Sequence, residues 1–491
     1  MTDSHHTSEL PKGWAWTELG EIAIEINSGF PSGRWKRGAE NGVPHLRPMN
    51  IATKGKIDLA DVKYVQAEGY DALSKGDVVF NNTNSPELLG KTAYIREDTN
   101  WAYSNHMTRI RFVPSLMEPA FIGHYLHFLF RNGYFKTRCV HHVNQASIGK
   151  DFLSKMRVPF PPSSEQKRVV TKLEELFACV DAGVEGLRKV KVQLKRYRQA
   201  VLKYAFEGKL TEEWRKTHID QIEPAKGLLE RVKQKEASNQ EPSPMKKSDL
   251  FTLPKDWIWT VFGEISRINM GQSPSGSSYN NSGHGTPLLN GPTEFGEEYP
   301  VAVQWTTSPV KICKKGDLLI CVRGNTTGRM NWADQEYCIG RGLAAITPLE
   351  NIVKRELLFS FLLMKVEEIM RRTRGSTFPN LKSDELHKFP FPLAAYTEQE
   401  ELVVRIGEAF SAARELERNM ATSFLHSERL RQSILKASFE GELVPPDPSD
   451  EPAEKLLERV KAERAKAMGE KDTNRRRKNM SKQLELSTYV K

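Results

Sequence analysis

Cysteine is scarce in this sequence, and the cysteines that occur are not paired. Five are present among 491 residues, at scattered positions, and no two form a Cys-x-x-Cys motif. Such motifs are typical of zinc sites and dithiol redox centres, so the sequence predicts no metal site of this kind. We interpret the five cysteines as reduced thiols that pack like small hydrophobic side chains.

Long apolar segments are also missing. Hydrophobic residues make up 38% of the chain and charged residues 27%. No apolar run approaches the roughly 20 residues of a membrane span, or the core of a secretory signal. We therefore expect a soluble, cytoplasmic protein with no membrane contact. A chain of 491 residues is too long for one hydrophobic core and should form several domains.

The excess of positive charge is mild. The net charge is +10 and the sequence pI is about 9.1, and neither large domain is a basic block. Such an excess favours an anionic partner, but it is also common in proteins that never bind nucleic acid.

Nucleotide-binding motifs are incomplete. Gly90-Lys-Thr92 resembles the end of a phosphate-binding loop, but the glycine required five residues earlier is replaced by Ser85. Gly340-Arg-Gly-Leu-Ala-Ala345 fits a loose dinucleotide pattern, but Pro348 stops any helix that would follow. Because a phosphate is held by a glycine-rich turn that leads into a helix, we predict no nucleotide site.

Motifs for other chemistry are missing as well. The sequence contains no Asn- or Asp-Pro-Pro-aromatic motif of a base methyltransferase, no convincing nuclease carboxylate cluster and no His-Glu-x-x-His. The adjacent pair His141 and His142 is interpreted as loop residues and not as metal ligands. The sequence therefore predicts no catalytic residue, no metal site and no cofactor bound by this chain.

The most informative feature that is present is a duplication. Leu10-Pro-Lys-Gly-Trp-Ala-Trp-Thr17 returns as Leu253-Pro-Lys-Asp-Trp-Ile-Trp-Thr260. Further motifs recur in the same order: Gly76-Asp77 as Gly316-Asp317, Glu165-Gln166 as Glu398-Gln399, Arg198-Gln199 as Arg431-Gln432, and Phe206-Glu-Gly208 as Phe439-Glu-Gly441. The stretches between these motifs hardly match. A duplication of this length predicts a pseudo-twofold molecule with one frame and two different heads.

Each half begins with a mixed head and continues into a long helix. Residues 10–160 and 253–390 contain short β-prone runs, polar loops and one helical stretch, which predicts an α+β fold for each head. A heptad pattern begins at Glu165 and ends near Gly208, and a weaker one covers 398–439. A helix with one apolar stripe needs a partner, so we expect the two helices to pair antiparallel.

Polar segments separate these parts. Residues 236–250 are expected to form a linker, and residues 465–491 are expected to be disordered. The basic cluster Arg475-Arg-Arg-Lys478 could graze phosphates, although a solvated tail is the commoner explanation.

The loops of the two heads carry side chains suited to DNA. Arg and Asn can form paired hydrogen bonds with guanine and adenine edges, although loop asparagines are more often turn residues and loop arginines more often solvated. The candidates in the first head are Arg34, Lys36, Arg37, Asn81, Asn82, Asn84, Asn105 and His106. Those in the second head are Arg323, Asn325, Arg329, Arg341, Arg374 and Ser376.

Taken together, the repeated motifs resemble those of a known family. Leu-Pro-x-x-Trp opens each half, Glu-Gln introduces each long helix, and Arg-Gln followed by Phe-Glu-Gly ends it. The chain is similar to the DNA-specificity subunit of type I restriction-modification systems over nearly its whole length. Thr377-Phe-Pro-Asn-Leu-Lys382 resembles the turn before the final strand of the family, whereas the first head has Gln145-Ala-Ser-Ile-Gly149 there.

The resemblance implies two target-recognition domains, each reading one half of an interrupted double-stranded DNA site, with paired coiled-coil helices as the ruler. Two modification (methyltransferase) subunits that bind S-adenosylmethionine and two restriction (motor-nuclease) subunits that use ATP and Mg would join this chain. The expected boundaries are 1–163 and 251–397 for the target-recognition domains, 164–210 and 398–444 for the central and distal spacer helices, 211–250 for the connector and linker, and 445–491 for a partly disordered C-terminal segment.

Two other functions remain open from the sequence. One is a self-sufficient DNA methyltransferase or endonuclease with degenerate motifs. The other is a coiled-coil adaptor that binds no nucleic acid.

Overall fold

The computed structural model describes residues 10–32, 42–66, 69–113, 115–236, 251–373, 380–467 and 469. These residues form two compact units. Unit 1 contains the described residues up to Leu187 together with those from Thr422 onward, and unit 2 contains Arg188–Ala421. Each unit therefore holds one head and parts of both long helices.

The centre of unit 1 is an antiparallel sheet with the order β2-β9-β5-β7. The strands are β2 (Ala23–Ser28), β9 (Met107–Phe112), β5 (Val78–Asn81) and β7 (Thr92–Tyr94). Side chains alternate between the two faces of a strand. Accordingly, Val78 and Phe80 join the large core beneath helix α2 (Pro119–Arg131), while Val79 joins a smaller core on the other face. The sheet is thus covered on both faces.

Shorter elements complete unit 1. A second sheet has the order β4-β3-β8, in which β3 and β8 are parallel. Its strands are β4 (Lys63–Val65), β3 (Val43–Leu46) and β8 (Ala102–Tyr103). The other elements are β1 (Ala15–Glu18) paired with β12 (Arg157–Phe160), α1 (Leu19–Ile22), α3 (Lys150–Lys155), the 3-10 turn Pro48–Asn50, and the small sheet of β10 (Val140–His141), β11 (Ala146–Ser147) and β6 (Thr83–Asn84).

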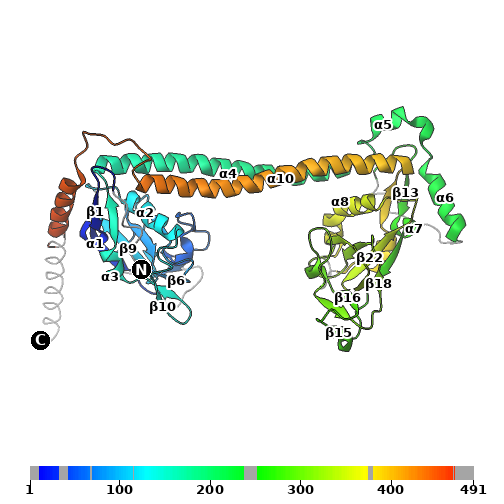
Figure 1. The fold of residues 1–491 in the computed structure, drawn as a ribbon, viewed down its shortest axis with the longest axis horizontal. Coiled ribbons are helices and arrows are strands. Elements are labelled where there is room, and N and C mark those ends of the chain that lie inside the picture. Colours follow the sequence, from blue (N-terminus) through cyan, green and yellow to red (C-terminus); the bar gives the residue numbers. More distant parts are fainter. Residues whose placement is uncertain are drawn as a thin grey trace. The chain divides into compact units, whose positions relative to one another are not determined.

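Unit 2 repeats this plan (Figure 1). Its central sheet, β14-β22-β19-β20, is formed by Ser266–Met270, Leu343–Pro348, Leu318–Cys321 and Met330–Trp332. Helix α8 (Arg355–Thr373) takes the place of α2. A five-stranded sheet has the order β15 (Tyr279–Asn280), β17 (Gln304–Thr306), β16 (Thr286–Leu289), β21 (Tyr337–Ile339) and β18 (Ile312–Cys313). The remaining head elements are β13 (Ile258–Val261), α7 (Phe262–Ile265), α9 (Ser383–His387), β23 (Pro390–Leu393) and the 3-10 turns Gly276–Ser278 and Pro292–Glu294.

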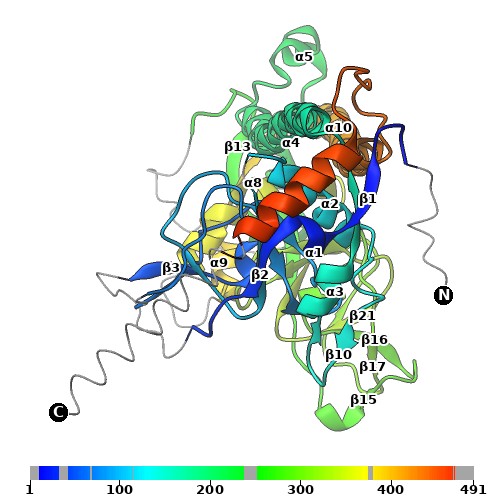
Figure 2. The same ribbon diagram turned by 90° about the vertical axis from the view of Figure 1, so that its left-hand side faces the viewer.

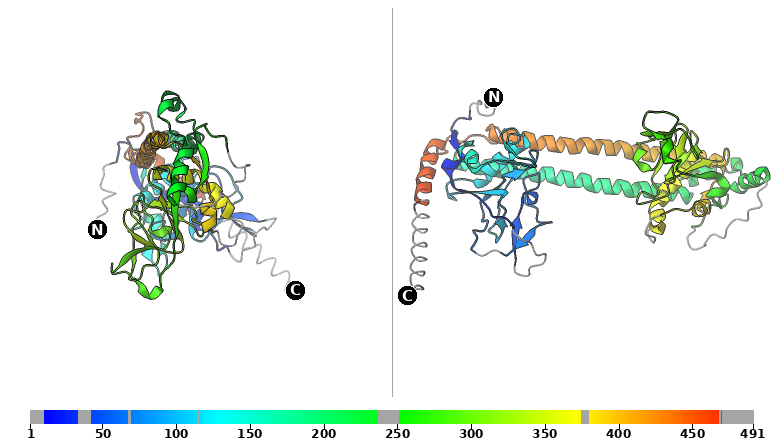
Figure 3. Two further views of the ribbon diagram at one scale, coloured as in Figure 1. Left: turned by 90° about the vertical axis from the view of Figure 1, so that its right-hand side faces the viewer. Right: turned by 90° about the horizontal axis from the view of Figure 1, so that it is seen from below.

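The two long helices are α4 (Ser163–Phe206) and α10 (Tyr396–Phe439). They run side by side within each unit, and their direction is antiparallel (Figure 3). In unit 1 the start of α4 packs against the end of α10, and in unit 2 the end of α4 packs against the start of α10. The predicted antiparallel pairing is therefore confirmed. Helix α4 runs without interruption through Gly183 and Gly186, where no neighbouring side chain is close.

The chain that follows each long helix adds further helical elements to the unit. In unit 2 these are α5 (Glu212–Thr217), the 3-10 turn Ile219–Gln221 and α6 (Ala225–Glu236), in a stretch expected to be only connector. In unit 1, residues 453–467 form a helix that lies against the first strands of the chain (Figure 2). Ala453 donates its backbone N–H to the carbonyl of Gly13, and Lys461 pairs with Glu21 at 2.9 Å. Of the expected linker 236–250 only Glu236 is described, and it ends α6; of the expected disordered tail 465–491, residues 465–467 are helical and most of the rest lies outside the described residues.

The repeated tryptophan and Glu-Gln motifs meet at the base of each head. The indole N–H of Trp14 donates to Glu165 at 3.0 Å, and that of Trp257 donates to Glu398 at 2.8 Å. The next residue, Gln166 or Gln399, accepts the first free backbone N–H at the start of α2 or α8. Because each helix begins with unpaired N–H groups, this buried glutamine fixes where the head helix begins.

No helix among the described residues is long and apolar enough to cross a membrane.

Candidate nucleic-acid interface

In unit 2, three loops meet at one edge of the central sheet. Neighbouring strands are antiparallel, so β14 and β19 end where β22 begins. The loops are therefore 271–278, 322–329 and 340–342. Backbone hydrogen bonds join the loops. The Gly271 N–H donates to the Leu343 carbonyl and the Val322 N–H donates to the Gly342 carbonyl, both at 2.9 Å. We call this edge the loop edge.

The loop edge of unit 2 presents exposed basic side chains. Arg323, Asn325, Arg329 and Arg341 are all exposed. Within the described part of the chain, the three guanidinium groups have no hydrogen-bond or ion-pair partner. None of the three loops contains Asp or Glu. Several carboxylates lie at the opposite edge of the sheet, whereas Glu294 lies on the segment beside the 340–342 loop, where it accepts the Gly291 N–H at 3.2 Å.

That segregation is visible in the strands themselves. Asp317 precedes β19, and Asp334 and Glu336 lie between β20 and β21, all at the end of the sheet away from the loop edge. Loops with unpaired arginines and no Asp or Glu of their own attract a polyanion.

The loop from β19 to β20 has a defined backbone. Gly324 and Gly328 have φ angles of 77° and 89°, which favour glycine. The hydroxyl of Thr327 donates to the Gly324 carbonyl at 2.7 Å. The side chains of Arg323, Asn325 and Arg329 therefore project from a fixed turn.

Unit 1 has the same loop edge with different side chains. The Gly29 N–H donates to the Met107 carbonyl, and the Asn82 N–H donates to the His106 carbonyl, in the same way as the two hydrogen bonds of unit 2. A Cβ atom on Gly29 would lie 1.9 Å from the Tyr103 carbonyl oxygen, and one on Gly271 would lie 2.2 Å from that of Gly340. Only glycine fits this crossing in either unit.

Three of the predicted base readers in unit 1 are at least partly accessible, and two of them lie at the loop edge. Asn105 is exposed and occupies the position of Arg341, while His106 beside it is half-buried. Asn84 is also half-buried, and its side-chain oxygen accepts the Ser85 N–H at 2.8 Å.

Asn81 and Asn82 do not face solvent. Asn81 is fully buried and donates to the Leu88 carbonyl at 2.9 Å. Asn82 is 6% exposed and donates to the Thr108 hydroxyl at 2.8 Å. This corrects our expectation for these two residues, because their amides satisfy the polar groups of a buried turn. They support the loop edge from beneath.

The remaining candidates, Arg34, Lys36, Arg37, Arg374 and Ser376, lie outside the described residues.

The turn that differs in sequence between the heads has the same backbone role in both. Ile148 N–H donates to the Asn82 carbonyl at 2.9 Å, and Leu381 N–H donates to the Val322 carbonyl at 2.8 Å. In unit 1 this turn carries strands β10 and β11, which we did not predict as part of the interface. The signal in the sequence was a stretch, 131–150, without any Asp or Glu.

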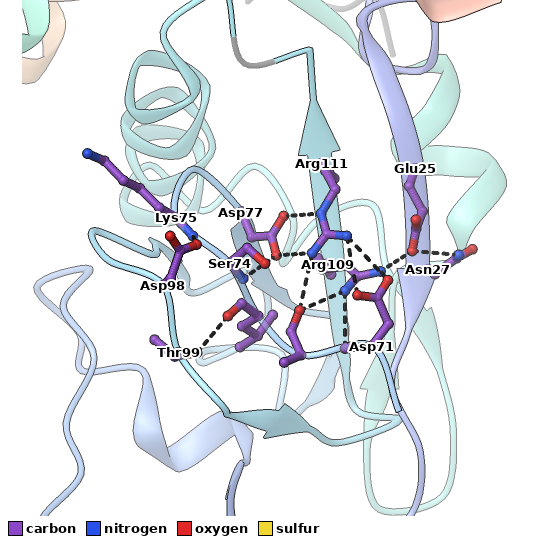
Figure 4. A network of polar contacts seen from close by, with 12 residues as sticks. Glu25, Asn27, Asp71, Ser74, Lys75, Asp77, Asp98, Thr99, Arg109 and Arg111 are labelled. Carbon is purple, nitrogen blue, oxygen red and sulfur yellow. Dashed lines mark hydrogen bonds and ion pairs between the residues drawn. The ribbon is translucent and has the colours of Figure 1, made fainter. Parts of the chain in front are cut away.

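A partly buried network of ion pairs lies along strand β9 of unit 1 (Figure 4). Arg109 of β9 is 1% exposed and pairs with Glu25 and Asp71. Arg111 pairs with Asp77 at 2.6 Å, and this hydrogen bond raises the pKa of Arg111. Burial raises the pKa of Asp71, but the hydrogen bond from Arg109 and the positive charges of Arg109 and Arg111 together outweigh burial, so the pKa is lowered overall. In β22 of unit 2, Ala345 and Thr347 occupy the positions of these two arginines, and Thr347 donates to Asp317 at 2.7 Å. These arginines therefore build the sheet of unit 1 and do not face a ligand.

Groups that could serve as catalysts are held in unreactive forms. Burial raises the pKa of the Cys313 and Cys321 thiols to about 12 and lowers the pKa of His124 to about 3. At neutral pH the two thiols are thus protonated and the imidazole is neutral. Among the described residues, no three His, Cys, Asp or Glu side chains are grouped so that they could hold a metal ion.

Comparison with known proteins identifies the class to which this fold belongs. The model of the family described as the type I restriction modification DNA specificity domain matches residues 11–188 and 254–420. The two matches together cover more than half of the chain, one in each head. The chain belongs to this family, and the resemblance seen in its repeated motifs is confirmed.

Its relatives are specificity subunits. The MjaX specificity subunit of Methanocaldococcus jannaschii is 28% identical over 409 residues, which are 81% of this chain and 87% of the relative. The EcoKI specificity subunit of Escherichia coli is 25% identical and covers 95% of this chain and 99% of the relative. This chain is thus a non-catalytic DNA specificity subunit, and the alternatives of a self-sufficient enzyme and of an adaptor without nucleic acid are set aside.

Solved structures show the same fold. The HsdS subunit of Thermoanaerobacter tengcongensis is 25% identical with a TM-score of 0.51, and covers 89% of this chain and 100% of its own. A chain from a study of assembly and conformational transition in the type I R-M system has a TM-score of 0.63 at 24% identity, with the same coverage.

Proposed function

We propose that each unit reads one half of an interrupted DNA site through its loop edge. The observation that carries this proposal is the charge of the loop edge in unit 2, where three unpaired arginines lie on loops that contain no Asp or Glu. Arginine can donate two hydrogen bonds to one guanine in the major groove. The different residues at matched positions, Asn105 in unit 1 and Arg341 in unit 2, suit two different half-sites.

The accessible readers we propose are Asn84, Asn105 and His106 in unit 1 and Arg323, Asn325, Arg329 and Arg341 in unit 2. Arg34, Lys36, Arg37, Arg374 and Ser376 remain candidates from the sequence. The domain boundaries given above remain our proposal for the two target-recognition domains and the spacer helices.

The paired helices α4 and α10 set the separation of the half-sites and provide docking surfaces for two modification subunits. Two restriction subunits join that complex. S-adenosylmethionine, ATP and Mg act on those partners, and the complex works on DNA in the cytoplasm. Supporting this, the sequence of the frame repeats while that of the heads does not, as expected if two copies of one partner bind two equivalent surfaces.

The test is the binding of duplexes that carry the recognition site by the chain assembled with its modification subunits. Arg341→Ala should weaken binding roughly tenfold, and base changes at one position of one half-site should then cost nothing further. Changes in the other half-site should cost as much as they do with the wild-type chain.

Arg355→Ala is the matched control. Arg355 is also an exposed arginine of unit 2, but it lies at the opposite end of the sheet near Gly316 and pairs with Glu356 at 2.9 Å. Binding by this variant should stay within about twofold of wild type. Equal losses in the two variants would show that Arg341 supplies only net charge.

A further inference from the structure

Unit 1 carries a two-stranded hairpin that extends its loop edge. Strands β10 and β11 pair with each other, and β11 also pairs with β6, with Ala146 opposite Asn84. The turn is closed by the His142 N–H, which donates to the Gln145 carbonyl at 2.7 Å. The base is anchored because Ala146 and Ile148 are buried. The hairpin thus has a fixed base beside a proposed base reader.

The tip of the hairpin is bare. All six residues from Val140 to Gln145 are exposed, and two of them are apolar. Val143 is 99% exposed and Val140 is 61% exposed. An exposed valine side chain contributes no hydrophobic stabilisation, and unit 1 does not bury Val143 in its core.

The residues around the hairpin are basic, which indicates what kind of partner it would bind. Residues 131–150 contain four Lys or Arg, two His and no Asp or Glu. Two carboxylates from outside this stretch pair with it, Glu87 with Lys136 at 3.4 Å and Glu428 with Arg131 at 3.0 Å. His142 shares a hydrogen bond with the Ser147 hydroxyl at 2.9 Å, and Arg138 lies over the ring of Tyr134 at 4.0 Å. A narrow basic projection with an apolar tip fits a polyanion with a groove better than a flat protein surface, which normally needs about 800 Å² from each partner.

The major groove of DNA has the right size and chemistry. It is about 12 Å wide and admits a two-stranded β-ribbon, and the C5-methyl group of thymine is the apolar group it displays. We propose that this hairpin enters the major groove of the half-site read by unit 1 and that Val143 contacts the methyl group of a thymine there. The inference rests on the proposed function and adds a contact that specifies one base.

The experiment removes either the thymine methyl group or the Val143 side chain. The complex of the chain with its modification subunits is titrated with duplexes in which each thymine of the half-site, on either strand, is replaced in turn by uracil, which lacks only the methyl group. Wild type should bind one of these duplexes about fourfold more weakly, the effect of one buried methyl group. Val143→Ala should bind the unmodified duplex more weakly by a similar factor, and the same uracil should then cost nothing more.

The control is Val301→Ala, because Val301 is 67% exposed and belongs to unit 2, not to the unit that carries the hairpin. It should behave as wild type with every duplex. Unchanged binding by Val143→Ala, losses that add instead of overlapping, or a half-site with no thymine on either strand would each overturn the inference. Failure of the wild-type complex to prefer its site over unrelated DNA would instead overturn the proposed function.

Discussion

At the scale of single residues, the two buried glutamates show how one motif is used in two settings. Glu165 accepts the Trp14 indole N–H, whereas Glu398 accepts that of Trp257, the Thr211 hydroxyl at 2.6 Å and the guanidinium of Arg215. Burial raises the pKa of Glu165, and the bond from Trp14 offsets this only in part. The charge of Glu165 is therefore poorly compensated at neutral pH, while that of Glu398 is paired.

Replacing these glutamates should have opposite consequences. Because the pKa of Glu165 is raised on folding, the folded state binds its proton more readily, and stability is lost as the pH rises through that pKa. Glu165→Gln should remove this loss, so that unit 1 of the variant gains stability relative to wild type as the pH rises above the ordinary glutamate range. Glu398→Gln should destabilise unit 2 by about 2 kcal/mol, since it weakens a charge-assisted bond.

Urea unfolding followed by hydrogen exchange in each unit measures both effects. A larger loss for Glu165→Gln than for Glu398→Gln at pH 7.5 would contradict this interpretation.

The base readers mark the limit of what single residues reveal in a sequence. Asn81 and Asn105 look alike as loop asparagines, yet one is buried and the other is exposed. The difference arises because Asn81 ends β5 within the sheet, whereas Asn105 lies beyond it in the turn between β8 and β9. Burial depends on strand pairing between distant segments, which the local sequence does not contain.

At the scale of elements, the repeated Arg-Gln motif holds the helix pair together. In unit 1 the Arg431 guanidinium lies 4.9 Å from the ring centre of Phe177 and pairs with Asp181. In unit 2, Arg198 lies 5.8 Å from the ring centre of Phe410 and pairs with Glu417 at 2.7 Å. Each arginine thus bridges from one helix to the other at an equivalent place in the two copies.

Arg431→Ala should loosen the helix pair in unit 1. Arg431 is 7% exposed, so its loss should cost about 2 kcal/mol through the ion pair and the ring contact. Hydrogen exchange of 165–187 and 422–439 should rise, while that of unit 2 stays unchanged. Arg429→Ala is the control, because Arg429 is exposed on the same helix. Equal exchange in the two variants would show that Arg431 does not join the helices.

The helices and central strands could be predicted from the sequence because their signals are local. The heptads predicted α4 and α10, and β-prone runs predicted β5, β9 and β19. The hairpin of β10 and β11 was missed because its strands are two residues long, and His141, His142 and Val143 have no alternating pattern. Its position follows from pairing with β6.

At the scale of the whole molecule, the duplication gives two heads of one design with different loop edges, and we propose that the helix pair is the ruler between the half-sites. Removing seven residues from α4 and the seven that face them in α10 keeps the apolar stripes in phase. Such a deletion shortens a helix by about 10 Å, so the preferred gap should shrink by about three base pairs.

The shortened protein should recognise the same base sequence in each half-site. Methylation assays with a series of gap lengths measure this, with a double alanine substitution at exposed helix positions as the length control. An unchanged gap in an assembled complex would argue against the ruler.

Mapping methylated bases across the genome of cells that carry this chain with its modification subunits tests whether each unit reads its own half of one interrupted site. We expect one motif made of two defined blocks with a fixed gap of unspecified bases. In cells that carry Arg341→Ala, only one block should lose a defined position. A single continuous motif, or a change in both blocks, would show that the two units do not read separate half-sites.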